Sequence, residues 1–460
     1  MNGFDPYVDF LGRRAKWSGD SGFAPESMPD WLFGFQSHLT EWALRKGRAA
    51  ILADCGLGKT AMELAWSDAI VRRFNKPVLL LTPLAVGAQT LREAEKFGVE
   101  AARSRDGKVS GSKVWITNYE QLSKFNPDDF AGVVGDESSC IKDFKSVTKS
   151  SVVEFMRTSP YRLLCTATAA PNDYWELGTS SEALGYMGFR DMITSFFKQE
   201  SEKDGLGWGR TKYRFRGHAE KLFWSWVCSW AKCIRRPSDI GFDDEGFILP
   251  PLIEHEHVVE AETLRPGMML AMPAISLQEQ REERRLSIPE RVAKAAEIID
   301  AHDGPSVAWC ELNDEGDALE RAISGSVQVK GSMLDEDKEE ILEAFAAGQI
   351  QKLVTKPKIG CWGLNWQHCS NTVMFPSHSF ERYYQGVRRF LRFGQANPVN
   401  VHLVISEGEA GVLKNLKRKM VQAESMFESL RTHMNDPLAI AKVERFSQQE
   451  QVPSWLLTSK

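Results

Sequence analysis

Short aliphatic runs alternate with longer amphipathic stretches along the first 170 residues of the chain. We expect strands at residues 49–53, 78–82, 114–117, 131–135 and 162–166. Helical stretches lie between most of them; in residues 86–97, apolar Val86, Leu91 and Ala94 lie opposite charged positions. Apolar strands that alternate with helices are typical of a parallel sheet covered on both faces.

A second series of the same kind begins near residue 290. Its expected strands cover 306–310, 325–329, 352–355, 371–375 and 400–405. Its helices include residues 288–302 and residues 334–348, the second with an acidic first turn and a glycine at its end, as helix termini favour. The two series share a rhythm and no sequence repeat. The pattern predicts an α/β fold with two lobes, each built on a parallel sheet.

The region between the two series has a different composition. Its first part is polar, basic and rich in glycine, and residues 219–236 carry the pattern of one amphipathic or buried helix. Within it, Trp224, Trp226 and Trp230 fit buried packing better than an exposed aromatic wedge, because this spacing does not place them on one helix face. The chain then divides into these expected parts: an N-terminal extension (1–30), a first lobe (31–185), a helical insertion and linker (186–289), a second lobe (290–410) and a C-terminal helix and tail (411–460).

Composition narrows the classes of protein. The 460 residues are 42% hydrophobic and 26% charged, which is ordinary for a globular protein, and the net charge of −5 offers no general basic field for nucleic acid. No apolar run approaches a membrane span, and the N-terminus lacks the layout of a signal peptide. Eight cysteines without paired knuckles suggest reduced thiols rather than disulfides or zinc, and the histidines of "EHEH" (254–257) fit a strand surface. We expect a monomeric cytoplasmic protein, in a bacterial cell or a phage-infected host, with no membrane contact.

Residues 53–60, "ADCGLGKT", form a candidate phosphate-binding loop between an expected strand and an expected helix. In such a loop the backbone N–H groups surround phosphate at the positive end of the helix. Gly56 and Gly58 allow close backbone approach, Lys59 neutralises phosphate charge, and the Thr60 hydroxyl can bind Mg²⁺. Ala53 stands where the general pattern has glycine, so a glycine-rich turn without a ligand remains the alternative. The expected nucleotide contacts in this loop are Asp54, Cys55, Gly56, Leu57, Gly58, Lys59 and Thr60.

Two adjacent acids follow the apolar run at 131–135. An aspartate at the end of a strand, Asp136, can hold a Mg²⁺ shell, and the next residue, Glu137, can orient or deprotonate an attacking water. The same two acids could instead cap a helix. The phosphate loop that precedes them favours the catalytic interpretation.

With these elements the sequence resembles the superfamily-two helicases, and within them the Swi/Snf-like branch of phage or bacterial type, over most of residues 30–407. Phe35-Gln36 is similar to the family's adenine-reading glutamine element, and the alanine at the head of the phosphate loop is normal in its motif I. Further segments resemble the remaining motifs: 79–97 (motif Ia), 116–122, 135–143 (motif II), 165–173 (motif III), 355–371 (motif V) and 385–395 (motif VI).

The resemblance implies two RecA-like lobes that hold ATP and Mg²⁺ between them. In "QGVRRFLRFGQ", Gln385, Arg389 and Arg392 would act on the γ-phosphate from the second lobe, with both arginines on one helical face. Thr60 and Asp136 would hold the magnesium. Nucleic acid would contact Thr82, Arg92, Asn118, Lys356, Lys358, Gly363 and Asn365.

Two segments depart from the family pattern. Ser138-Ser139 replace the usual small residue and His or Asp of motif II, and Ala169 stands where motif III usually has proline. Thr166 and Thr168 remain; we favour hydrogen bonds between the lobes for them, with strand-end capping as the alternative.

The sequence therefore predicts an ATP-dependent nucleic-acid motor, a DNA-dependent ATPase of helicase or translocase type. Duplex DNA is the favoured track, and single strands or RNA stay open. A phosphate-loop kinase or GTPase would explain Lys59 and Asp136 but leave the second lobe unexplained. A nucleic-acid-binding module without hydrolysis is the third class.

Overall fold

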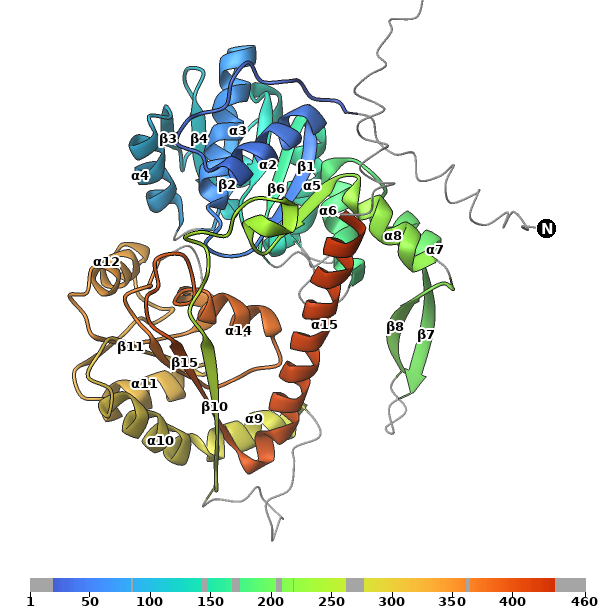
Figure 1. Cartoon of the computed structure of the whole chain (residues 1–460). Coiled ribbons are helices and arrows are strands. Elements are labelled where there is room, and N and C mark those ends of the chain that lie inside the picture. Colours follow the sequence, from blue (N-terminus) through green and yellow to red (C-terminus); the bar gives the residue numbers. More distant parts are fainter. Residues whose placement is uncertain are drawn as a thin grey trace, which may run out of the picture.

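The computed structural model has two lobes, each built around one parallel β-sheet with helices beside it (Figure 1). The structure describes residues 20–83, 86–141, 147–167, 174–203, 209–217, 219–261, 277–360 and 365–434. The predicted α/β class with two parallel sheets is confirmed.

The first lobe contains a seven-stranded sheet in which all neighbouring strands run parallel. In spatial order its strands are β3 (Ala101–Arg103), β4 (Val114–Asn118), β2 (Val78–Thr82), β5 (Gly132–Gly135), β6 (Tyr161–Cys165), β1 (Arg48–Ala53) and β9 (Ala231–Ile234). Every residue of β2 is buried, as expected for a strand with helices on both faces. All five strands expected from the sequence are present, and β3 and β9 are additional.

Seven helices surround this sheet within the described residues: α2 (Gly34–Lys46), α3 (Lys59–Phe74), α4 (Gly87–Phe97), α5 (Val147–Thr158), α6 (Leu177–Leu184), α7 (Phe189–Phe196) and α8 (Ala219–Cys228). Short 3-10 turns occur at Tyr119–Lys124, Pro127–Asp129, Ser138–Ile141, Tyr174–Glu176 and Pro237–Ile240. An antiparallel hairpin of β7 (Phe197–Lys203) and β8 (Gly209–Phe215) extends away from α7 and α8 (Figure 1).

The single helix expected over residues 219–236 is wrong in its second half. Helix α8 ends at Cys228, and the chain then forms β9, which pairs with β1 at the edge of the first sheet. Trp224, Trp226 and Trp230 are buried in the first-lobe core, as the packing interpretation expected. The signal for this strand is hidden in the sequence, because "AKCI" is short and continues the apolar pattern of the helix before it.

The second lobe contains a six-stranded parallel sheet. In spatial order its strands are β10 (Leu252–Val259), β15 (Val399–Ser406), β14 (Asn371–Met374), β11 (Ser306–Trp309), β13 (Lys352–Thr355) and β12 (Ser326–Gln328). Its helices are α9 (Leu277–Leu286), α10 (Ile288–Asp300), α11 (Asn313–Ala322), α12 (Asp335–Ala346), α13 (Pro357–Gly360) and α14 (Phe380–Val387), with a 3-10 turn at Glu407–Glu409. The "EHEH" segment lies in β10, where His255 stacks on His402 of β15.

Helix α15 (Ala410–Met434) connects the two lobes (Figure 1). Leu413, Leu416 and Ala423 from its first half lie in a core cluster of the second lobe. Met426, Phe427 and Leu430 from its last turns lie in the core of the first lobe. The expected charged C-terminal helix is therefore an apolar bridge between the lobes as well.

Six described cysteines, on both lobes, are free thiols, which agrees with the expected absence of a disulfide framework in that part of the chain. Within the ranges given above, no helix is both long enough and apolar enough to cross a membrane.

Candidate active site between the lobes

The loop between β1 and α3 has a backbone that only glycine accommodates at two positions. Gly56 and Gly58 have φ angles of 87° and 72°, in the left-handed region. A Cβ on Gly56 would lie 2.9 Å from the backbone nitrogen of Phe393 in the second lobe, and a Cβ on Gly58 would lie 2.3 Å from Gln36 Nε2. The two glycines thus allow the loop to turn tightly beneath the other lobe.

Lys59 begins α3 and folds back over its own loop. Its Nζ donates to the carbonyl oxygens of Ala53, at 3.0 Å, and Asp54, at 3.4 Å. Burial acts to lower the pKa of Lys59, but the acidic groups around it, including Asp136 and Glu137, offset burial and raise this pKa. The ammonium group of Lys59 therefore stays positively charged. It lies at the start of α3, and a helix N-terminus itself favours an anion.

Asp136 and Glu137 lie directly after the end of β5. Asp136 is 8% exposed, and burial together with the charge of Glu137 raises its pKa to about 7. Glu137 has a φ of 50°, which is strained for a residue with a side chain. Its Oε1 accepts hydrogen bonds from Ser139 Oγ at 2.8 Å and Thr166 Oγ1 at 2.7 Å, so its direction is fixed.

These bonds account for two residues that the sequence left open. Ser139 departs from the family pattern, and its hydroxyl supports the candidate catalytic glutamate. The bond from Thr166 lies within the first lobe, so it differs from the expected hydrogen bond between lobes. Thr168 and Ala169 lie outside the described residues.

Glu63 is a buried carboxylate that the sequence analysis missed. It lies one turn after Lys59 on α3 with 0% exposure, beside the carboxyl group of Asp136 and the thiol of Cys165. Burial, and then the nearby charge of Asp136, raise its pKa well above the usual value. A sequence signal was available, because Glu63 lies four residues after Lys59 and therefore shares its helix face.

The two arginines of "QGVRRFLRFGQ" reach the same cavity as the phosphate loop. The expectation that they share a helical face is wrong: α14 ends at Val387, and residues 388–394 form turns. Burial and the neighbouring Arg389 lower the pKa of Arg392 to about 10. Two guanidinium groups this close repel each other, so an anion between them would stabilise the arrangement. Residues from both lobes line the cavity: Cys55, Gly56, Gly58, Lys59, Thr60, Pro83, Val86, Gln89, Glu93, Asp136, Glu137, Arg389 and Arg392.

Gln385 lies one turn before these arginines on α14. Its side chain is 3% exposed, and its Nε2 has no hydrogen-bond partner within the described ranges. Its backbone carbonyl accepts from Arg389 Nε at 3.4 Å. Gln385 therefore supports the arginine turn through its backbone, and it is absent from the residues that line the cavity.

Asp54 has a different position from the one expected for a nucleotide contact. Its carboxylate accepts hydrogen bonds from Tyr384 Oη and from Arg388, the latter at 2.7 Å, both in the second lobe. The opposite charge of Asp54 raises the pKa of Arg388 despite its burial. This ion pair ties the phosphate loop directly to the motif VI segment.

The adenine-reading element also differs from expectation. Phe35 is 2% exposed and belongs to the first-lobe core. Gln36 is buried, its Nε2 donates to Leu57 O at 2.9 Å, and its Oε1 accepts from Phe33 N at 3.1 Å, so it braces the phosphate loop. The exposed rings nearby are Phe33 (53%) and Phe393 (46%), which both contact Phe247. Sequence reasoning missed this aromatic group because its members come from three distant segments.

The residues expected to contact nucleic acid have mixed positions. Thr82 is 1% exposed, with its hydroxyl directed at Thr117 O, so the expectation of a surface contact is wrong for it. Asn118 caps the turn that follows β4, and Lys356 donates to Asn313 at 2.6 Å. Three others complete the set: exposed Arg92 and Lys358, and half-buried Asn365. Gly363 lies outside the described residues.

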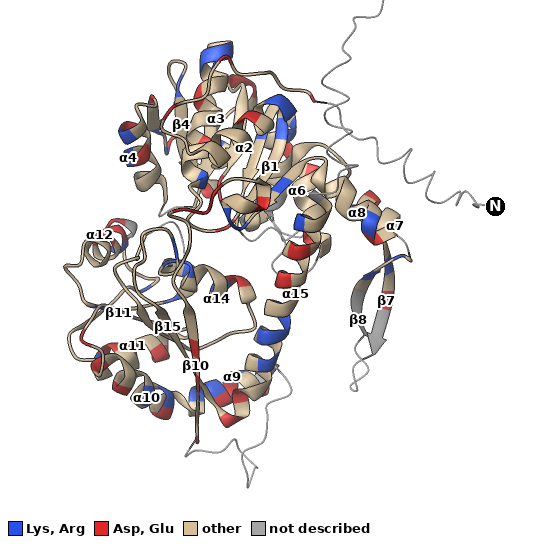
Figure 2. Ribbon diagram, in the orientation of Figure 1, with Lys and Arg blue, Asp and Glu red and all other residues tan. Residues whose placement is uncertain are grey.

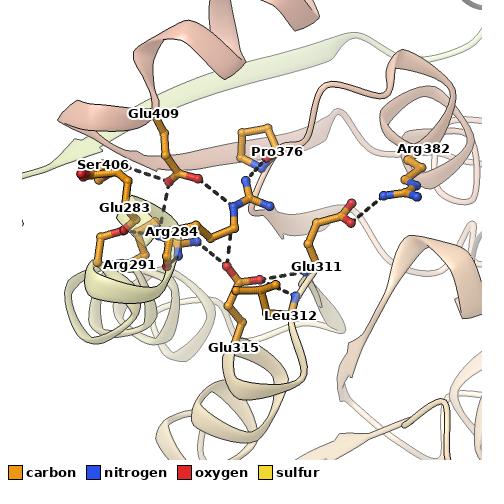
Figure 3. A network of polar contacts seen from close by, with 11 residues as sticks. Glu283, Arg284, Arg291, Glu311, Leu312, Glu315, Pro376, Arg382, Ser406 and Glu409 are labelled. Carbon is orange, nitrogen blue, oxygen red and sulfur yellow. Dashed lines mark hydrogen bonds and ion pairs between the residues drawn. The ribbon is translucent and has the colours of Figure 1, made fainter. Parts of the chain in front are cut away.

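A second group of buried charges lies in the second lobe, away from the cavity, and we call it the second-lobe ion network (Figure 3). Arg291 donates to Glu315 at 2.8 Å and lies 3.4 Å from Glu409, while Arg284 donates to Glu409 at 2.8 Å. Glu315 also accepts from two backbone N–H groups. Burial raises the pKa of Glu315, but Arg291 and Arg284 outweigh it and lower this pKa below the ordinary value.

The donor set fits a magnesium ion that is shared with phosphate and water. Among the described residues, no group of three or more His, Cys, Asp or Glu side chains is arranged to hold a metal by itself. Thr60 and Asp136 both line the cavity and supply one hydroxyl and one carboxylate. Mg²⁺ commonly binds through one or two protein oxygens together with substrate phosphates.

A scan against protein-family models gives no match, and a search of curated proteins gives none either. Arguments about function therefore rest on the residues and their geometry.

Proposed function

We propose that the protein is an ATP-dependent nucleic-acid motor of the superfamily-two type, with two RecA-like lobes of the Swi/Snf-like kind. One observation carries the proposal. Lys59, Thr60, Asp136 and Glu137 of the first lobe line one cavity with Arg389 and Arg392 of the second lobe. A phosphate loop alone would fit many enzymes, whereas two arginines contributed by a second lobe fit hydrolysis controlled by lobe movement.

The cavity residues suit the binding of a nucleoside triphosphate. The left-handed turns at Gly56 and Gly58 lead into the start of α3, where the backbone N–H groups of a helix N-terminus favour phosphate. Lys59 Nζ donates to carbonyl oxygens of its own loop, and it can turn to phosphate oxygens instead. A bound Mg²⁺, held by Thr60 and Asp136, would neutralise phosphate charge there.

Each remaining residue has a separate task in hydrolysis. Glu137, fixed by Ser139 and Thr166, orients the attacking water and takes up its proton. Arg389 and Arg392 stabilise the negative charge that develops on the transferred phosphoryl group. The Asp54–Arg388 ion pair keeps the arginine segment over the phosphate loop.

The base would lie against the aromatic group next to the loop. Phe33 and Phe393 are exposed, belong to different lobes and are joined through Phe247. Rings of this kind stack on a nucleobase without selecting one strongly. The proposal thus assigns base contact to Phe33 and Phe393, and loop bracing to Gln36.

ATP hydrolysis by the full chain tests the proposal. We expect nuclease-treated protein to hydrolyse ATP slowly and duplex DNA to stimulate the rate, with stimulation falling steeply as salt increases. Lys59→Ala should abolish nucleotide binding and hydrolysis, and Lys76→Ala, an exposed lysine of the same lobe, should leave both unchanged. Hydrolysis that ignores DNA and RNA at low salt would instead support a kinase- or GTPase-like enzyme.

The type of movement needs a second assay. The resemblance implies tracking along duplex DNA with weak strand separation. We expect displacement of a third strand from a triplex and little unwinding of a forked duplex. Strong unwinding without triplex displacement would identify a strand-separating helicase.

A further inference from the structure

Three arginines of the first lobe face three glutamates on one helix of the second lobe. Arg92 lies on α4, and Arg103 and Arg105 lie at the end of β3 and just after it. Glu336, Glu339 and Glu343 are spaced by three and four residues on α12, so they share one face of that helix. Figure 2 shows α12 below α4 with acidic positions along it. We call these six residues the α4–α12 clasp.

The contacts in the clasp are specific but weakly held. Arg92 donates to Glu343 at 2.8 Å, and Arg105 lies 4.0 Å from Glu336. The side chains of Arg92 and Glu343 are 56% and 46% exposed. Exposed pairs of this kind are screened by salt and add little free energy. Another anion can therefore displace the glutamates.

The third pair, Arg103 and Glu339, is more buried than the other two, and its hydrogen bonding is less complete. Burial and then Arg105 lower the pKa of Arg103, while Glu339 opposes them. Glu339 Oε1 is buried without a hydrogen-bond partner in the described part of the chain. A Cβ on Gly87 would lie 3.3 Å from Arg103 Nε and 3.4 Å from Thr82 Oγ1, so Arg103 lies beside Thr82 at the start of α4.

We infer that Arg92, Arg103 and Arg105 form a binding surface for the phosphodiester backbone of nucleic acid, and that the α12 glutamates occupy this surface in the free protein. The inference rests on the proposed function and adds to it. Arg103 ends β3 and lies beside Thr82, the last residue of β2, and Arg105 follows two residues later. Arg92 lies on α4, the helix that follows β2. A phosphate that takes the N–H groups now paired with the glutamates displaces those carboxylates, so a bound backbone favours separation of α12 from α4.

Binding of a labelled 30-base-pair duplex to the full chain without nucleotide, measured by fluorescence anisotropy, tests the surface. Glu343→Gln should tighten binding about two- to fivefold, and the triple variant Glu336→Gln, Glu339→Gln, Glu343→Gln about tenfold, because a competitor is removed. Arg92→Ala should weaken binding and lower the salt slope by about one. Asp337→Asn, which removes the same charge from another face of α12, serves as the matched control and should change affinity less than about twofold.

A charge swap separates the clasp from the proposed function. Hydrogen exchange of α12 and α4 amides, without nucleic acid, should become faster in Arg92→Glu and in Glu343→Arg, and return to normal in the double variant. The double variant should still bind duplex weakly. Glutamate variants that bind no tighter than wild type would overturn the inference, while DNA-stimulated hydrolysis would still support the motor. Suppose that hydrogen exchange responds to the charge swap but the chain binds neither DNA nor RNA. This result would overturn both the inference that the arginines bind a phosphodiester backbone and the proposed motor function.

Discussion

Two groups of buried charges in this molecule have opposite arrangements. The cavity contains Lys59, Asp136, Glu137, Arg389 and Arg392. Asp136 lies beside Glu137 and Arg389 beside Arg392, so like charges are neighbours, while Lys59 lies among the acids. The pKa of Asp136 is raised to about 7, and the pKa of Arg392 is lowered to about 10. In the second-lobe ion network each acid faces an arginine, and the pKa of Glu315 is lowered.

This difference indicates that the second-lobe ion network stabilises the fold and that the cavity charges bind a ligand. Arg291 and Glu315 are fully buried, but each is paired and hydrogen-bonded (Figure 3). Buried charges are tolerated in this form. In the cavity, burial and a neighbouring like charge raise the pKa of Asp136 and lower the pKa of Arg392, and a cation beside the first and an anion beside the second would favour their charged forms. Strained charges of this kind are typical of functional sites.

The largest expected effect is on catalysis through the arginines of the cavity. Arg389→Ala and Arg392→Ala should lower the rate of ATP hydrolysis by about 10³–10⁵-fold, because arginine fingers act on the transition state. Nucleotide affinity and thermal stability should change little. Single-turnover hydrolysis and equilibrium nucleotide binding measure the two effects, with Arg321→Ala on the surface of α11 as control. Equal losses of affinity and rate would point to a structural role.

The next largest effect is on stability through the second-lobe ion network. Glu315→Ala removes the acid closest to buried Arg291 and leaves only Glu409, at 3.4 Å, among the acids described beside it, so it should lower the free energy of unfolding by up to about 3–5 kcal/mol. Urea denaturation of the full chain measures the change.

Replacing both partners, Glu315→Leu with Arg291→Met, should recover most of that loss, since no charge is left unpaired. A double variant as unstable as the single one would show that the network fixes the second lobe by more than charge pairing.

Substitution of Glu63 should change the free energy of unfolding in the opposite direction to substitution of Glu315. Glu63→Met removes a fully buried carboxyl group that lies beside Asp136, and because the cost of burying this group disappears, it should raise the free energy of unfolding by about 1–3 kcal/mol. Exposed Glu41→Met is the control for the substitution itself. A loss of stability at Glu63 would mean that the carboxyl group is well accommodated and that the contrast between the two groups is smaller than proposed.

The pH dependence of stability should have opposite signs in the two groups. For each single carboxyl group, the free energy of unfolding should change by at most about 1.4 kcal/mol per pH unit. The folded pKa of Glu315 is below its unfolded value near 4.3, so its contribution is complete above about pH 4.3 and is lost in acid. The folded pKa of Asp136 is about 7 and its unfolded value about 3.9, so stability falls as pH rises through that interval.

Unfolding of wild type, Glu315→Gln and Asp136→Asn from pH 3 to 8 (a range of roughly one unit beyond both windows), in magnesium-free buffer, tests these signs. Asp136→Asn should gain stability over wild type as pH rises from about 4 to 7, and Glu315→Gln should approach wild type only below about pH 4.

Local pattern was sufficient for most of the fold. Strands such as β2 and β13 match the expected residues because continuous apolar runs between helices leave little freedom. Edge strands were harder to find. β3 has three residues and β9 has four, and β9 follows an apolar helix directly, so only pairing with β1 reveals it. The same limit explains why α15 was expected as a charged helix and not as a bridge between lobes.

The sequence by itself determined which residue types the candidate site contains: a loop with Gly56, Gly58 and Lys59, an acid pair after a strand, and arginines spaced by three. These are local signals, because glycine conformation and strand ends depend on a few neighbouring residues. Only the tertiary structure decided how these parts meet. It brings Arg389 and Arg392 over a loop 330 residues earlier and ties Asp54 to Arg388. It also buries Phe35 and Thr82, and it joins Arg92 to Glu343. Contacts between lobes depend on surfaces that no single segment encodes, so they become visible only when both lobes are folded.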